Sequence, residues 1–354
     1  MKFIIATGGT GGHLFPALRV AKELKRAGND ILFLGSFTRG RKQIQKSGFT
    51  FEEVGAKGFV GASFRGKVVS AVRMIKAVFR SFRSLKKFRP DAVLGFGGYG
   101  AFPVVLSAVV LRCPALIHEQ NVVPGRANAL LAKFVQKIAV SFQKSERYFD
   151  PKKTVLTGCP CHLPKDDADR TAILSEFQLK EGKRTILVFG GSQGSRRINE
   201  VFIETAGSLR EQLDFQVIHI SGGQDHQKLQ DRYNQLGIPF ALFDFLDKME
   251  KAYHISDLVI SRAGAVTVSE IIRFKLPAIF IPYPHAYGHQ KENASVLCDA
   301  GAAQLIKDKD FSASRLSETI LTVFDSRDTT KKLADVCFPD AVERLVQEAL
   351  CLAQ

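Results

Sequence analysis

The fold is decided by a short apolar run that enters a glycine cluster, Lys2-Phe3-Ile4-Ile5-Ala6-Thr7-Gly8-Gly9-Thr10-Gly11-Gly12-His13. Lys2–Ala6 is typical of a short buried strand, and a helical pattern follows the glycines. The second half of the chain repeats this design, because Thr185–Phe189 enters Gly190-Gly191-Ser192-Gln193-Gly194-Ser195 before another helical segment. A glycine loop between a strand and a helix exposes backbone N–H groups at the positive end of the helix dipole, where an anion is favoured.

Further strand-like runs alternate with helical segments along both halves. They are Ile31–Leu34, Ala92–Gly95, Ala115–His118 and Ile138–Ser141 in the first half, and Phe215–Ile220, Phe240–Phe243, Leu258–Ile260 and Ala278–Ile281 in the second. This alternation predicts an α/β protein with two Rossmann-like domains, each a parallel sheet covered on both faces. We expect domains at residues 1–158 and 159–338, followed by a closing helix within 339–354. Since ligands bind at the carboxyl ends of parallel strands, we expect the active site in the cleft between the domains.

The composition is that of a globular protein. Of its 354 residues, 45% are hydrophobic and 24% are charged, which excludes wholesale disorder. Six cysteines without a C-x-x-C pair indicate a reduced, cytosolic compartment. The longest apolar run, Ala101–Leu111, ends at Arg112 and is shorter than the roughly 20 residues of a membrane span. No secretory signal fits the first residues, so we expect a soluble protein.

The positive charge belongs to the first half of the chain. Residues 1–160 hold 27 Lys and Arg against 8 Asp and Glu, a net of +19, whereas residues 161–354 hold 23 against 27, a net of −4. This asymmetry indicates that one domain holds an anionic partner, which could be a nucleic acid, an anionic membrane or a phosphorylated substrate.

The densest basic stretch, Arg65–Arg89, contains no acid and has a helical period. Its apolar stripe consists of Val68, Val72, Ile75, Phe79 and Phe82, and its basic stripe of Arg73, Lys76, Arg80, Arg83 and Lys87. One interpretation is a surface helix whose apolar stripe faces the protein's own core. The other is a basic amphipathic helix that lies on an anionic membrane, with part of its apolar surface exposed.

The first glycine loop lacks the features of a dinucleotide site. Leu14 stands where the third glycine of the fingerprint should fall, and no acid ends Ile31–Leu34, so an oxidoreductase is not favoured. His13 falls in the first helical turn, where the helix dipole disfavours the imidazolium form. It is therefore a candidate general base, the alternative being a histidine that only caps the helix.

The second glycine loop allows two interpretations. Its N–H groups and the Ser192 hydroxyl can face a diphosphate. The letters Gly190-Gly191-Ser192-Gln193-Gly194 also satisfy the nucleophile-elbow pattern G-x-S-x-G of hydrolases, with Asp257 and either His285 or His289 in the right order to complete a triad.

Two later segments carry polar groups suited to sugars. The stretch Ser261–Glu270 repeats the strand, loop and helix design, and the Glu270 carboxylate could accept hydrogen bonds from the vicinal hydroxyls of a ribose or only complement the helix dipole. Pro282–Asn293 then brings His285, His289, Gln290 and Asn293 after another strand. The stretch Cys159-Pro160-Cys161-His162 matches no standard zinc spacing, so a hinge is expected there and no metal site.

Five motifs, taken together and in order, resemble the MurG family. These bacterial transferases add N-acetylglucosamine to the lipid-linked muramyl-pentapeptide precursor of peptidoglycan. The motifs are Gly8-Gly9-Thr10-Gly11-Gly12-His13-x-x-Pro16, Gly95-Phe96-Gly97-Gly98-Tyr99, His118-Glu119-Gln120-Asn121, Gly190-Gly191-Ser192-Gln193-Gly194 and Arg262-Ala263-Gly264-Ala265-x-Thr267-x-Ser269-Glu270. The resemblance covers nearly the whole chain. It implies a GT-B fold, with two Rossmann-like domains facing across a cleft and the last helix returning to the first domain.

The resemblance also implies roles for individual residues. UDP-N-acetylglucosamine is expected in the second domain, with Glu270 on the ribose, Ser192 on the diphosphate and Leu246 on the uracil. The full donor set is Thr10, Gly11, Gly12, Asn121, His162, Ser192, Leu246, Ala265, Val266, Thr267, Val268, Ser269, Glu270 and Gln290. His162 stands where the family usually has a donor-contacting arginine, so donor affinity or its pH dependence is expected to differ.

The acceptor is expected on the first domain, at the cytoplasmic face of the membrane. His13 is implied as the base that deprotonates the muramyl 4-hydroxyl, with Tyr99, His118 and Glu119 near the acceptor and Glu119 as the second candidate base. Arg73, Lys76, Phe79, Arg80, Phe82 and Arg83 are expected to hold the enzyme at anionic lipid. No cofactor and no metal are expected.

Three alternatives stay open at this point. A related transferase could use another UDP-sugar or a diacylglycerol acceptor, and a serine hydrolase could use Ser192. A nucleic-acid-binding module would explain the pI near 9.6. We do not expect a nucleic-acid partner, because aliphatic residues interrupt the basic stretch at helical period and no recognised nucleic-acid motif is present.

Overall fold

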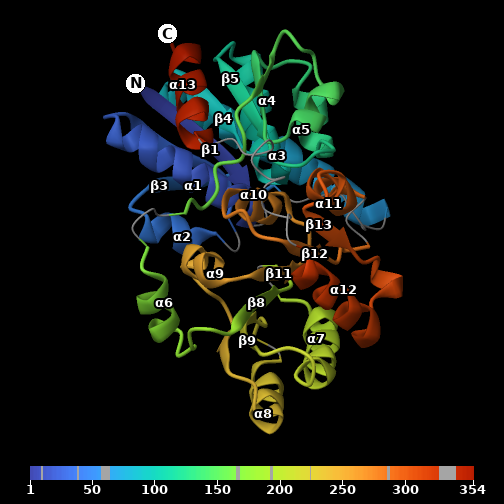
Figure 1. The fold of residues 1–354 in the computed structure, drawn as a ribbon. Helices are drawn as coiled ribbons and strands as arrows, with labels where there is room; N and C mark the ends of the chain where they lie inside the picture. The colour runs from blue at the N-terminus through green and yellow to red at the C-terminus, as the bar shows by residue number, and fades with distance from the viewer. Residues whose placement is uncertain are drawn as a thin grey trace. The chain divides into compact units, whose positions relative to one another are not determined.

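The computed structural model describes residues 1–8, 11–37, 40–56, 64–164, 168–191, 194–223, 225–284, 288–326 and 340–354, with only the backbone of 64–68. It divides into two compact units, and in Figure 1 the first is coloured from blue to green and also includes the red helix at the end of the chain. Unit 1 consists of Met1–Cys161 together with Phe338–Gln354, and unit 2 of His162–Cys337. The change between them falls inside the stretch Gly158–Pro164, where the sequence suggests a hinge.

The described part of unit 1 is built on a seven-stranded parallel sheet of order β3-β2-β1-β4-β5-β6-β7. Its strands are β1 (Lys2–Gly8), β2 (Asp30–Ser36), β3 (Thr50–Glu53), β4 (Ala92–Gly95), β5 (Ala115–Glu119), β6 (Lys137–Val140) and β7 (Thr154–Leu156). The glycine-loop strand β1 lies in the middle, hydrogen-bonded to β2 on one side and β4 on the other. The expected parallel sheet is confirmed. The sequence analysis missed the two edge strands β3 and β7.

Alternate side chains of the central strands enter cores on opposite faces of the sheet. Phe3 and Ile5 face one core with α1 and α13, whereas Ile4 and Ala6 face the other with α3 and α4. The helices of unit 1 are α1 (Gly11–Arg26), α2 (Arg41–Lys46), α3 (Phe64–Phe88), α4 (Gly98–Val110), α5 (Arg126–Leu131), the 3-10 helix η1 (Gln143–Tyr148) and α13 (Ala341–Leu352). The two-sided cover explains why these strands read as continuous apolar runs.

The last helix packs on unit 1, where α13 lies beside α1 (Figure 1). Leu345 and Ala349 are fully buried in the core that also holds Phe3 and Ile5. An ion pair between Lys137 Nζ and Glu348 Oε2, 3.0 Å apart, links the same helix to β6. Residues at the far end of the sequence therefore complete the core of the first sheet.

Unit 2 is built on a parallel sheet of order β10-β9-β8-β11-β12-β13, six strands within its described residues. The strands are β8 (Arg184–Phe189), β9 (Phe215–Ile220), β10 (Phe240–Phe243), β11 (Leu258–Ser261), β12 (Ala278–Phe280) and β13 (Ala303–Leu305). The sequence analysis missed the edge strand β13. The helices are α6 (Arg170–Glu176), α7 (Arg196–Leu209), α8 (His226–Leu236), α9 (Met249–Ile255), α10 (Ala265–Arg273), α11 (His289–Asp299), α12 (Ala313–Asp325) and the 3-10 helix η2 (Asp308–Asp310).

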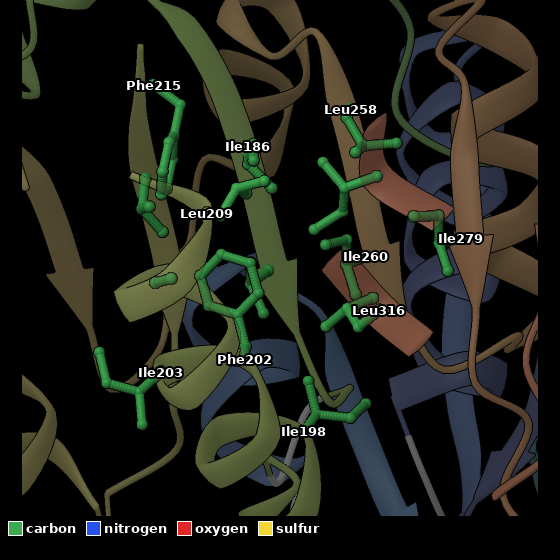
Figure 2. Close-up of a cluster of buried hydrophobic side chains, with 14 of the residues drawn as sticks. Ile186, Ile198, Phe202, Ile203, Leu209, Phe215, Leu258, Ile260, Ile279 and Leu316 are labelled. Carbon is green, nitrogen blue, oxygen red and sulfur yellow. The ribbon is translucent and has the colours of Figure 1, made fainter. Parts of the chain in front are cut away.

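One face of this second sheet is covered by an apolar core that Figure 2 shows in detail. Phe202 and Ile198 on α7 face Ile186 on β8 and Ile260 on β11 (Figure 2), and all four side chains are fully buried. Leu316 on α12 belongs to the same core. This packing sets the position of α7, and therefore of the glycine loop that precedes it.

The packing of α13 gives a stability prediction. Leu345→Ala removes a side chain that is 0% exposed, so the free energy of unfolding of unit 1 should fall by about 2–5 kcal/mol. Urea unfolding followed by circular dichroism, with hydrogen exchange of the β1 amides, measures the loss. Gln347→Ala, on the exposed side of the same helix, is the matched control. Equal stability of both variants would contradict a structural role for α13.

Candidate active site

Glycines at the carboxyl end of the unit 1 sheet let strands and helices approach closely. A Cβ atom on Gly98 would lie 2.5 Å from the carbonyl oxygen of Gly8, and one on Gly100 would lie 2.7 Å from the Ser36 nitrogen. Gly97 and Gly98 have φ values of 84° and 77°, in the left-handed region that favours glycine. The motif Gly95–Tyr99 is therefore needed for the packing of α4 on β1 and β2.

His13 lies in the first turn of α1, as the sequence predicts. Its imidazole packs against the backbone of Gly97 and Gly98, because a Cβ on Gly97 would lie 3.2 Å from His13 Nδ1 and one on Gly98 3.3 Å from His13 Cδ2. Its Nδ1 is 3.1 Å from Gln120 Oε1. Gln120 is a partner that the sequence analysis did not assign.

Behind His13 lies a buried polar chain. His118 is 0% exposed, with Nδ1 3.0 Å from Gln120 Nε2 and Nε2 3.1 Å from the Gly158 carbonyl oxygen. Burial lowers the pKa of His118 from 6.5 to about 4, and the side chain is therefore neutral at physiological pH. His118 thus lies beneath Gln120 in this structure, and its implied contact with the acceptor stays a prediction.

Glu119 holds the loop that follows β5. Its Oε1 accepts hydrogen bonds from the backbone and side-chain nitrogens of Asn121, at 2.9 and 3.1 Å. Its Oε2 accepts from the Gly125 nitrogen at 3.0 Å and from Asn128 Nδ2 at 2.9 Å. Four donors surround one buried carboxylate, so Glu119 stabilises this loop. Its role as a second candidate base stays a prediction.

The other predicted residues of unit 1 lie at the same end of the sheet. Gly11 and Gly12 open α1, and Tyr99, 37% exposed, lies in the first turn of α4. Asn121 follows β5 and accepts a hydrogen bond from Ser145 Oγ at its carbonyl oxygen. Thr10 lies outside the described residues. The ligand contacts of all of them stay predictions.

The second glycine loop connects β8 to α7. A Cβ on Gly194 would lie 2.2 Å from the Ser221 carbonyl oxygen, and Gly191 has φ of 98°, so both positions require glycine. Ser195 is the residue before the first turn of α7. Ser192, the predicted diphosphate ligand, lies outside the described residues.

Arg262, 9% exposed, joins the ends of several strands of unit 2. Its guanidinium donates to Ser195 Oγ at 3.2 Å, to the Ile281 carbonyl oxygen at 2.9 Å and to Asp308 Oδ1 at 2.8 Å. These partners follow β8, β12 and β13. In the sequence, Arg262 stands within one of the five motifs but received no role. The signal that could have identified it is a cation placed directly after a buried strand.

Glu270 on α10 lies beside the residue that replaces the family arginine. Its Oε2 accepts a hydrogen bond from the Tyr253 hydroxyl at 2.9 Å, and its Oε1 is 3.4 Å from the His162 backbone nitrogen. The His162 ring has Nδ1 2.9 Å from Glu250 Oε2 and Nε2 3.9 Å from Glu270 Oε1. His162 therefore lies between two carboxylates, and the sequence analysis identified neither Glu250 nor Tyr253.

The remaining donor predictions fall on α10 and on two loops. Ala265, Val268 and Ser269 are buried, whereas Val266 and Thr267 are half-buried in the first turn of α10. Leu246 is half-buried after β10. Gln290 Oε1 accepts a hydrogen bond from the Tyr283 nitrogen at 2.8 Å and so holds the chain after β12. Their contacts with a donor stay predictions.

The hydrolase alternative is wrong for the triad that the sequence allows. Asp257 Oδ2 accepts a hydrogen bond from the Thr185 nitrogen at 2.7 Å, at the amino end of β8. The Gly190–Ser195 loop follows the carboxyl end of the same strand. Five residues of strand at about 3.3 Å each separate the two ends, too far for one triad. His285 lies outside the described residues.

Among the described residues, no group of three or more His, Cys, Asp or Glu side chains is arranged to hold a metal ion. Cys159 and Cys161 are both buried.

The first interpretation of α3, in which its apolar stripe faces the protein's own core, is wrong for the exposed face of this helix. Val72, Ile75 and Phe79 are 47%, 58% and 73% exposed, so this part of the apolar stripe does not face the core. Small buried residues, Ser70, Ala77 and Ser81, form the inner face that lets α3 approach α4. Phe82 is half-buried, and Arg73, Lys76, Arg80 and Arg83 are exposed. The side chain of Val68 is outside the described part.

No described helix is long and apolar enough to cross a membrane.

Comparison with known proteins gives consistent matches over both units. The glycosyltransferase family 28 N-terminal domain matches residues 3–140, and the family 28 C-terminal domain matches residues 185–345. A crystal structure of MurG from Acinetobacter baumannii, 29% identical, covers 99% of both chains with a TM-score of 0.78. The domains and the fold define a glycosyltransferase of family 28 with the expected GT-B architecture.

Curated relatives narrow this class to one family. The UDP-N-acetylglucosamine–N-acetylmuramyl-(pentapeptide) pyrophosphoryl-undecaprenol N-acetylglucosamine transferase of Thermodesulfovibrio yellowstonii is 38% identical, over 99% of this chain and 98% of that protein. The enzyme of the same name from Halothermothrix orenii is 37% identical, over 94% and 93%. The chain belongs to the MurG family of glycosyltransferases.

The four hydrogen bonds of Glu119 give a prediction about the loop after β5. In Glu119→Gln an amide group must face two N–H donors in either orientation, so stability should fall by about 1–3 kcal/mol. The Asn121 and Gly125 amides should exchange their hydrogens faster. Glu343→Gln, at an exposed position of α13, is the control and should leave both amides unchanged. Unchanged exchange in Glu119→Gln would show that the carboxylate does not hold the loop.

Proposed function

We propose that this chain transfers N-acetylglucosamine from UDP-N-acetylglucosamine to the 4-hydroxyl of the muramyl sugar in undecaprenyl-diphospho-muramyl-pentapeptide. The reaction converts lipid I to lipid II in peptidoglycan synthesis. The observation that carries the proposal is near-full-length similarity to transferases whose names state this sugar and this acceptor. The site supports it, because each unit places a glycine loop and a helix start at the carboxyl end of its sheet, where ligands of such folds bind.

The proposed chemistry is a displacement with inversion at the anomeric carbon. His13 takes the proton from the acceptor hydroxyl as that oxygen attacks, and the linkage changes from α to β. The diphosphate leaves beside the Gly190–Ser195 loop and the first turn of α7, where N–H groups stabilise the developing charge. Glu270 binds the ribose, Leu246 the uracil, and Tyr99 lies on the acceptor side.

Replacement of His13 tests this chemistry. In His13→Ala, kcat for transfer of labelled sugar to the lipid-linked acceptor should fall by on the order of 10²–10⁴-fold, the contribution of a general base. The donor KM should change little. His254→Ala is the matched control, because His254 contacts the Ala168 carbonyl oxygen away from the glycine loops.

The possible outcomes test the identity of the base and the identity of the reaction separately. Undiminished transfer by His13→Ala would support the proposed reaction and show that another residue is the base. A folded wild type that binds UDP but gives no lipid II would contradict the proposed acceptor. Transfer of another UDP-sugar in preference would contradict the proposed donor.

The membrane partner is a finer proposal that rests on α3. Phe79, 73% exposed, lies among the exposed cations Arg73, Lys76, Arg80 and Arg83. Apolar side chains that insert between lipids, flanked by cations that contact anionic headgroups, are the features of a helix that lies on a membrane surface. We infer that this face docks unit 1 on the anionic cytoplasmic leaflet, where the lipid-linked acceptor is found.

Vesicle binding tests this surface. Arg73→Glu, Arg80→Glu and Arg83→Glu combined should abolish most binding to vesicles containing phosphatidylglycerol, at about 1 kcal/mol for each charge removed near the surface. Raising salt from about 0.1 M to about 1 M, which shortens the screening length from about 10 to 3 Å, should weaken wild-type binding. Arg232→Glu, on exposed α8, is the control. Binding insensitive to both changes would refute the proposal, and equal salt-sensitive binding to duplex DNA would favour a nucleic-acid partner.

A further inference from the structure

The polar chain behind His13 contains two backbone carbonyl groups that act only as acceptors. Gln120 Nε2 is 3.1 Å from the Phe96 carbonyl oxygen, and His118 Nε2 is 3.1 Å from that of Gly158. Gln120 is 2% exposed and His118 is 0% exposed, so water does not substitute for these partners. Each carbonyl therefore requires an N–H group on the atom that faces it.

These two requirements set the amide orientation of Gln120 and the tautomer of His118. Ser141 Oγ also lies 3.4 Å from His118 Nε2, but it donates its hydrogen to the Glu119 carbonyl oxygen at 3.1 Å. The Phe96 carbonyl requires the amide nitrogen of Gln120 on its side. The Gly158 carbonyl requires the hydrogen of neutral His118 on Nε2, which leaves a lone pair on Nδ1 to accept from Gln120 Nε2 at 3.0 Å. Both ends thus give the same orientation of the Gln120 amide, and its oxygen faces His13.

We propose that Gln120 fixes the tautomer of His13, so that Nδ1 carries the hydrogen and Nε2 carries the lone pair that a general base needs. Gln120 is then a positioning residue, which acts on the reaction through His13. The inference rests on the proposed function only in giving His13 the role of base. With the opposite tautomer, a lone pair on Nδ1 would face the lone pairs of Gln120 Oε1 at 3.1 Å.

The surroundings of His13 support a single ring orientation. Gly97 and Gly98 lie against the imidazole, at positions where a Cβ would be 3.2 and 3.3 Å from ring atoms. The backbone of these glycines therefore confines the ring, with Nδ1 placed 3.1 Å from Gln120 Oε1. The tautomer of an imidazole is generally set by the partner of its other nitrogen.

The tautomer can be read by nitrogen NMR of protein labelled with ¹⁵N-histidine, without substrate and at about pH 9, where imidazoles are neutral. The His13 signals are assigned by their loss in His13→Gln. In wild type we expect Nδ1 protonated and Nε2 bare. Gln120→Met, which has no acceptor, should populate the Nε2–H form.

A role limited to packing would leave the tautomer unchanged in Gln120→Met. Gln136→Met is the matched control, since Gln136 accepts one hydrogen bond from the Ala115 nitrogen elsewhere in unit 1 and should leave the His13 signals unaltered. The proposal is overturned if wild-type His13 carries its hydrogen on Nε2, or if folded Gln120→Met keeps it on Nδ1.

Transfer assays on the same variants connect the tautomer to the reaction. Gln120→Met should lower kcat by on the order of 10²-fold with the donor KM nearly unchanged, because a bare Nδ1 leaves no lone pair on Nε2. Full activity with an altered tautomer would overturn the catalytic part of the inference. The spectra need no substrate, so a wild type that transfers to a different acceptor would refute the proposed function and leave the tautomer assignment standing.

Discussion

The close approach of backbones at the carboxyl end of β1 is the constraint on which the rest of the site depends. Gly8, Gly98 and Gly100 have no Cβ, so α4 can begin almost in contact with β1 and β2. This contact fixes Gly97, whose backbone forms one wall beside His13. A larger side chain at any of these positions would separate helix and strand, since backbone atoms cannot yield as a flexible side chain can. Gly8, which belongs to the predicted anion loop, thus also serves the packing of α4, and the placement of the imidazole follows from that packing.

In unit 2, a buried charged side chain holds together the loops at the carboxyl end of the sheet. Arg262 is almost buried, and a buried guanidinium is tolerated only when its donors are satisfied. Ser195, Asp308 and the Ile281 carbonyl supply partners from three different loops, so the cation holds those loops together. In unit 1 the corresponding task falls to the carboxylate of Glu119, which accepts four hydrogen bonds from the loop after β5 and from Asn128.

The central strands were predictable because both faces are covered, which leaves continuous apolar runs such as Lys2–Ala6. The edge strands β3, β7 and β13 were missed, since short strands with half-exposed side chains carry no such run. One interpretation of α3 was wrong about its inward face, which consists of Ser70, Ala77, Ser81 and Leu85 and not of Val72, Ile75 and Phe79. His13 and Glu270 stand beside glycine loops, so the sequence could nominate them as candidates, and their roles stay predictions. Gln120, Arg262 and Tyr253 act through partners distant in sequence, which no local pattern records.

The role of His162 also depends on partners that are distant in the sequence. An arginine fork approaches one carboxylate with parallel donors, whereas the two nitrogens of an imidazole point in different directions. His162 can therefore lie between Glu250 on α9 and Glu270 on α10. With Tyr253 on its other oxygen, Glu270 is oriented before any ligand arrives. A ribose that reaches this carboxylate meets an acceptor whose rotamer is already selected, so less ordering is required on binding. The contacts of His162 and Tyr253 with Glu270 thus preorganise the residue proposed to bind the ribose.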